Sequence, residues 1–117
     1  MNPVSMIAGL RAAVGAGGYL APNLTGRLFG LDPDANPQAA FVARLFAARD
    51  LALAAGTLGS DGDARRQWLQ LGMACDLADA VAALLAGRNG TLPKPAAIMS
   101  GGTALAGAAM GVAALRQ

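Results

Sequence analysis

Six ionisable side chains lie inside stretches of the sequence that are otherwise almost entirely apolar. They are three arginines and three aspartates: Arg11, Arg44, Arg49, Asp50, Asp76 and Asp79. A charge at the depth of a bilayer core is costly and is by default a functional-site hypothesis. Guanidinium and carboxylate groups held together can bind a small polar or anionic group, relay protons, or share the acid, base and charge-stabilising roles of an enzyme. The sequence names neither a ligand nor a reaction.

Helical geometry predicts which of these charges meet. Take Gly62 as the tip of a helical hairpin. Arg49 then lies thirteen residues before the tip and Asp76 fourteen residues after it. Arg44 and Asp79 lie eighteen residues before it and seventeen after it. At a rise of about 1.5 Å per residue, each arginine falls within about one rise of an aspartate in depth.

The first connection extends this pattern. From a midpoint near Gly30, Arg11 lies nineteen residues back and Asp50 twenty residues forward. The three arginines and three aspartates therefore form a potentially neutral buried set. A purely structural alternative is that these pairs set the register of neighbouring helices and do nothing more.

We assign roles to these residues as hypotheses. Catalytic or proton-handling roles are predicted for Asp76, Asp79 and Arg49, and ligand-binding roles for Arg11, Arg44 and Asp50. In the first hypothesis the set is a polar-ligand or proton site of a membrane protein. In the alternative, the protein is a membrane-embedded epoxide hydrolase, cyclase or isomerase acting on a lipophilic substrate. One aspartate would then be the base or acid, and Arg49 would stabilise developing negative charge.

The composition fits a small membrane protein. The 117 residues make a single domain, 1–117, with 55% hydrophobic and 14% charged residues. A soluble domain usually has about a quarter of its residues charged. A net charge of +2 does not favour nucleic acid. With a single cysteine and no histidine, we expect no disulfide, no metal site and no cofactor.

Four apolar stretches must position the charges. They cover 4–21, 38–58, 66–86 and 96–115, and prolines or glycine-rich segments separate them. Alanine and leucine dominate, which favours helices, and each length is close to the roughly 20 residues that cross a hydrocarbon core. We therefore predict an all-α, up-down-up-down transmembrane four-helix bundle in a lipid bilayer. A short helix at 24–29 would lie at the membrane interface or cover a pocket. A soluble alanine-rich bundle is the alternative, although 96–115 offers almost no polar stripe.

Two segments carry a resemblance to a known family. Residues 44–53, RLFAARDLAL, resemble the R-x-F/G-x-R-D/E-L-x-x-G segment of small bacterial four-helix membrane proteins of unassigned function. Residues 72–79, GMACDLAD, resemble the G-D-x-x-D helix that follows in that family, which is itself distantly similar to the DoxX type. Cys75 and Ala54 replace glycines that are frequent in the family. The resemblance implies the four-helix fold, the Arg/Asp hairpin and a bacterial cytoplasmic membrane, but no activity.

The remaining expectations concern partners. Besides the lipid bilayer, we expect a lipophilic or anionic small molecule to bind near the charges. Gly107 and Gly111 form a small-xxx-small motif, which permits close helix approach. The motif could serve packing inside the chain or a homo-oligomer.

Overall fold

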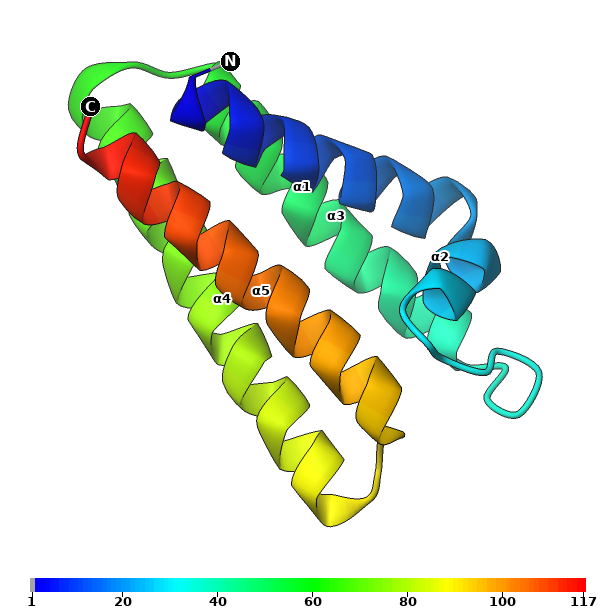
Figure 1. Cartoon of the computed structure of the whole chain (residues 1–117). Helices are drawn as coiled ribbons and strands as arrows, with labels where there is room; N and C mark the ends of the chain where they lie inside the picture. Colours follow the sequence, from blue (N-terminus) through cyan, green and yellow to red (C-terminus); the bar gives the residue numbers. More distant parts are fainter. Residues whose placement is uncertain (1) are drawn as a thin grey trace.

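The computed structural model describes residues 2–117 and is helical throughout, with no strand in that range. Its five helices are α1 (Pro3–Leu20), α2 (Pro22–Leu28), α3 (Ala39–Leu58), α4 (Gly62–Asn89) and α5 (Lys94–Leu115) (Figure 1). The all-α prediction is confirmed, and the four long helices coincide with the four predicted stretches to within a few residues. The short helix predicted at 24–29 is α2.

The helix ends follow from local residue chemistry. Pro3 stands in the first turn of α1, where the Asn2 side chain accepts a 2.8 Å hydrogen bond from the Ser5 amide. Gly90 ends α4 with a φ of 75°, a left-handed conformation that favours glycine. The predicted stretch ended at residue 86, whereas α4 continues through Gly87 to Asn89. A Cβ at Gly87 would lie 2.9 Å from the Cβ of Ala97, so this glycine permits close approach of α5.

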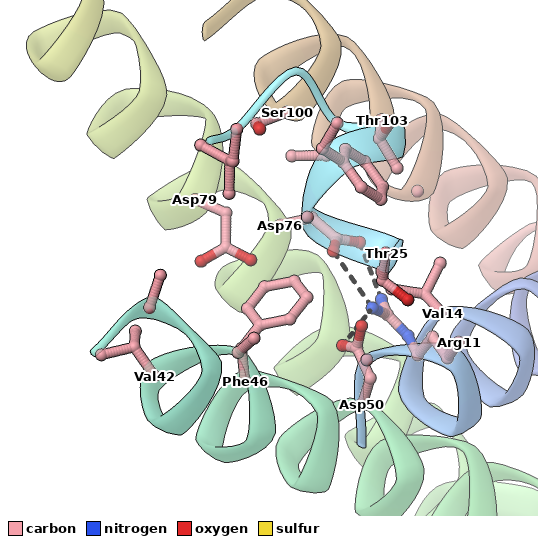
Figure 2. A pocket seen from close by; sticks show the side chains of 18 of the residues that line it. Arg11, Val14, Thr25, Val42, Phe46, Asp50, Asp76, Asp79, Ser100 and Thr103 are labelled. Atoms are coloured by element: carbon pink, nitrogen blue, oxygen red, sulfur yellow. Dashed lines mark hydrogen bonds and ion pairs between the residues drawn. The ribbon is translucent and has the colours of Figure 1, made fainter. Parts of the chain in front are cut away.

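The long helices pack mainly as two antiparallel pairs, α1 with α3 and α4 with α5 (Figure 1). The pairs lie close together near the two chain termini and diverge toward the end that carries α2 (Figure 1). Near the termini, Ile7, Leu69 and Ala114 form a buried apolar cluster between α1, α4 and α5. Toward the diverging end, the side chains of Arg11, Asp50 and Asp76 lie between the pairs (Figure 2).

Close contact between α1 and α3 depends on small residues. A Cβ at Gly15 would lie 2.7 Å from Cγ of Leu51 and 3.0 Å from the carbonyl oxygen of Ala47. A Cβ at Gly18 would lie 3.1 Å from the Cβ of Ala47. These glycines therefore bring the two helix backbones together.

The outer surface is strongly apolar. Two helices, α4 and α5, are long and apolar enough to cross a membrane. Large hydrophobic side chains are exposed on all four long helices, for example Leu20 on α1, Phe41 on α3, Leu84 on α4 and Ile98 on α5. An exposed apolar surface of this extent is typical of a membrane or protein interaction face. Membrane crossing by α1 and α3, and with it the up-down-up-down transmembrane bundle, stays a prediction.

Two glycines of α1 offer a matched test of this packing. Gly15→Ala should lower the free energy of unfolding by about 1–3 kcal/mol, because the added methyl overpacks the α1–α3 contact. Gly9→Ala should raise it by up to about 1 kcal/mol through helix propensity, since no described atom lies within 4 Å of a Cβ there. Unfolding of the purified variants in detergent micelles measures both changes. Equal stabilisation by the two alanines would contradict the close α1–α3 contact.

Candidate functional site

The centre of the site is an ion pair between α1 and α4. Arg11 donates two hydrogen bonds to Asp76, from Nη1 to Oδ1 at 3.0 Å and from Nη2 to Oδ2 at 2.7 Å. The two side chains are only 7% and 8% exposed. A two-point guanidinium–carboxylate pair is the strongest form of charge-assisted hydrogen bonding in proteins. This pair therefore joins the α1–α3 unit to α4 across the interior.

Two glycines make room for this ion pair. A Cβ at Gly72, four residues before Asp76 on α4, would lie 2.6 Å from Nη2 of Arg11. A Cβ at Gly107 on α5 would lie 2.7 Å from Oδ2 of Asp76. The function of Gly72 was missed by sequence reasoning; its one-turn spacing from Asp76 was the available signal.

Gly107 and Gly111 therefore pack inside the chain. Gly107 lies beside Asp76, and a Cβ at Gly111 would overlap the side chain of Met73 on α4. Both glycines are buried. Of the two interpretations of the motif, packing inside the chain is the one observed. A homo-oligomer stays a prediction.

A second ion pair lies one turn further along α4. Arg49 of α3 donates two hydrogen bonds to Asp79, at 3.2 Å to Oδ1 and 2.5 Å to Oδ2. The guanidinium carbon also lies 4.5 Å from the centre of the Phe46 ring, within cation–π range. The side chains of Arg49 and Asp79 are 34% and 27% exposed, so this pair is more accessible than the Arg11–Asp76 pair.

Asp50 lies between the two ion pairs. One carboxylate oxygen is 3.8 Å from Nη1 of Arg11 and 3.9 Å from Nη2 of Arg49. Both distances exceed hydrogen-bond range. No hydrogen bond from any group within residues 2–117 reaches its carboxylate. Its side chain is 7% exposed, so Asp50 is a buried carboxylate that shares two guanidiniums without a hydrogen bond to either.

Two of the predicted pairings are wrong. Arg49 meets Asp79 and not Asp76, because Arg11 reaches across from α1 and occupies both oxygens of Asp76. Arg44 does not join the set at all. It is exposed, and its Nε donates a 3.0 Å hydrogen bond to the carbonyl of Tyr19 near the end of α1.

The expected charge balance is therefore also wrong. Arg44 and Arg49 are five residues apart, about 140° around a helix, so one faces the interior and the other faces outward. Among the described residues, the connected set of buried and half-buried charges contains two arginines and three aspartates. Its formal charge is +2 − 3 = −1 when all five groups are ionised. The set is acidic and not neutral.

These charges form part of the wall of a cavity of about 540 Å³ (Figure 2). Figure 2 shows Arg11, Asp50 and Asp76 joined together, with Val42 and Phe46 along α3 and Ser100 and Thr103 along α5. The complete wall comprises Leu10, Arg11, Val14, Gly18, Thr25, Gly26, Phe29, Leu31, Asn36, Gln38, Ala39, Val42, Ala43, Phe46, Asp50, Asp76, Asp79, Ser100, Thr103, Ala104 and Gly107. Of the predicted site residues, the cavity brings together Arg11, Asp50, Asp76 and Asp79. Arg49 lies beside it and Arg44 lies away from it.

The short helix α2 covers part of this cavity. Thr25 and Gly26 of α2, and Phe29 directly after it, contribute to the wall. Leu24 and Leu28 of the same helix are exposed on the outside. The sequence left open whether this helix covers a pocket or lies at a membrane interface. The covering position is observed, and the interfacial position stays a prediction.

The cavity has a largely apolar wall, with acidic and hydrogen-bonding side chains at one end. A wall whose exposed surface is mostly carbon, with a set of convergent polar groups, is typical of small-molecule sites. Within residues 2–117, no group of three or more His, Cys, Asp or Glu side chains is placed to hold a metal ion. The described wall thus combines apolar surface with charged and hydroxyl groups at one end.

Comparison of the chain with protein-family models, with curated proteins and with solved structures finds no match. The resemblance of 44–53 and 72–79 to small bacterial membrane proteins stays a prediction. The function of the cavity has to follow from its own chemistry.

The central ion pair can be tested by removing one partner. Arg11→Met should lower the free energy of unfolding by about 3–5 kcal/mol, because it leaves the Asp76 carboxylate buried without a partner. Arg88→Met, an exposed arginine of α4, should change it by no more than about 0.5 kcal/mol. Unfolding in detergent micelles measures both.

The double variant Arg11→Met/Asp76→Leu separates pairing from packing. Replacing both charges removes the unpaired carboxylate, so stability should return to near that of the unmodified protein. A single Arg11→Met variant as stable as Arg88→Met would show that the ion pair does not hold α1 to α4.

Proposed function

We propose that this protein is a small integral membrane protein whose four long helices line a binding cavity for a lipophilic small molecule with a polar group. The observation that carries the proposal is the cavity of about 540 Å³, with apolar walls and a cluster of Arg and Asp side chains at one end. Ligand pockets in proteins commonly measure about 300–1,000 Å³.

The surface supports a membrane location for all four helices. The exposed side of each long helix carries large hydrophobic residues, whereas Arg11, Asp50 and Asp76 are buried. Arg11 and Asp50 therefore need not face lipid, which reduces the cost of placing α1 and α3 in a bilayer, whereas Arg44 of α3 faces outward. The bacterial cytoplasmic membrane is the location that the family resemblance implies.

The geometry favours binding over turnover. Asp76 and Asp79 were the predicted acid and base, yet each accepts two hydrogen bonds from an arginine. Both oxygens of each carboxylate are therefore engaged by guanidinium donors instead of being presented freely to a substrate. Acid–base catalysis on a lipophilic substrate, and a proton site, remain alternative hypotheses for the same residues. Turnover would have to use Asp50, which accepts no hydrogen bond from the described residues.

Residues of α5 allow the cavity to be blocked. Thr103→Phe should weaken binding of a photoreactive diazirine analogue of decanol by about tenfold or more, because the ring fills space beside the charges. Gly102→Phe is the matched control, since no described atom lies within 4 Å of a Cβ at Gly102. The protein is reconstituted in phosphatidylcholine liposomes, illuminated with the probe, and the labelled residues are mapped by mass spectrometry.

Saturation distinguishes the cavity from the lipid-facing surface. Labelling of wall residues such as Phe46 should saturate and be competed by unlabelled decanol, whereas labelling of Leu84 on the outside should not. Ser100→Phe provides a second blocking variant from the same wall. Non-saturable labelling throughout the unmodified protein would overturn the proposal.

A further inference from the structure

The charged groups that face the cavity are mostly acidic. Its wall contains Arg11, Asp50, Asp76 and Asp79, a formal charge of +1 − 3 = −2. The second arginine of the network, Arg49, is not part of the wall; it lies close to both Asp79 and Asp50 and adds one positive charge, which leaves a net charge of −1 for the five groups. Charges surrounded by protein and hydrocarbon are weakly screened, so an excess of one sign acts strongly on a bound molecule.

Asp50 differs from the other two carboxylates of the wall in its hydrogen bonding. Asp76 and Asp79 are each held by two hydrogen bonds from an arginine, whereas Asp50 receives none within residues 2–117. Its side chain is 7% exposed, and it lines the cavity. A buried carboxylate without a donor carries a large desolvation cost. A positively charged group in the cavity would lower that cost.

The rest of the wall suits an organic cation. Phe29 contributes an aromatic ring to the wall, and ring faces attract cations, whereas the Phe46 ring already carries the Arg49 guanidinium. Thr103 donates its hydroxyl hydrogen to the carbonyl of Met99 at 2.8 Å, so its oxygen is left as an acceptor. In such a molecule, an alkyl or aromatic body would fit the apolar part of the wall, and a cationic head would fit the acidic end.

We propose that the cavity selects lipophilic organic cations over neutral and anionic molecules of the same shape, and that Asp50 receives the positive charge. This inference rests on the proposed function, because it assigns a ligand class to the same cavity. It replaces the expectation of an anionic ligand, which followed from a charge set that included Arg44.

Three amphiphiles with one chain length test the selectivity. Decyltrimethylammonium, decanol and decyl sulfate compete with the photoreactive decanol analogue for wall residues of the reconstituted protein. Concentrations are expressed as mole fraction in the membrane, so that different partitioning does not affect the comparison. Decyltrimethylammonium should compete at a mole fraction about tenfold or more below that of decyl sulfate, as expected for a nearby excess of negative charge.

Asp50→Asn tests the assigned residue. The amide keeps the shape of the side chain and removes its charge, so the preference for the ammonium should disappear while decanol still competes. Asp63→Asn, at an exposed position in the first turn of α4, should leave the preference unchanged. Retention of the full preference in Asp50→Asn would overturn the role of Asp50.

The outcomes separate the two proposals. If none of the three amphiphiles competes for the wall residues, the binding function itself fails. If decanol competes but the ammonium is no better than the sulfate, the cation selectivity fails and the cavity remains a binding site. The comparison on the unmodified protein decides this second case without any variant.

Discussion

The two-point ion pair between Arg11 and Asp76 is the interaction on which the arrangement of the helices depends. The α1–α3 and α4–α5 pairs are each held by small residues, but they diverge from each other away from the chain termini. Arg11 bridges that divergence with two hydrogen bonds to α4. Gly72 and Gly107 leave the space that this pair occupies. A side chain at either glycine would displace the ion pair.

The cavity is a consequence of the same geometry. Between diverging helix pairs, the mostly small buried side chains of this protein leave space, and α2 covers part of it. The second ion pair, Arg49–Asp79, lies on the same face of α4 one turn further along. Asp50 lies between the two guanidiniums as the surplus charge. The cavity thus has a largely apolar wall and a charged end, where the Asp50 carboxylate accepts no hydrogen bond from the described residues.

The charged residues illustrate where sequence reasoning succeeds and where it stops. Their confinement to otherwise apolar stretches identified Arg11, Arg49, Asp50, Asp76 and Asp79 as a group that folding would bring together. Depth along a helix, however, does not specify which side of the helix faces a neighbour. Arg44 had a suitable depth but lies about 140° from Arg49 around α3 and faces outward. The depth estimate around Gly62 compared only α3 with α4. It therefore omitted Arg11 of α1, which is the residue that binds Asp76.

By itself, the sequence determined the helical class, the approximate ends of the long helices and the membership of most of the charge cluster. These follow from local propensity, from proline and glycine at helix ends, and from the cost of isolated charges in apolar segments. The tertiary structure decided the ion-pair partners, the acidic balance, the packing roles of Gly72 and Gly107, and the cavity beneath α2. Those depend on how each helix is rotated and tilted against its neighbours, which is a property of the packing of all the helices together.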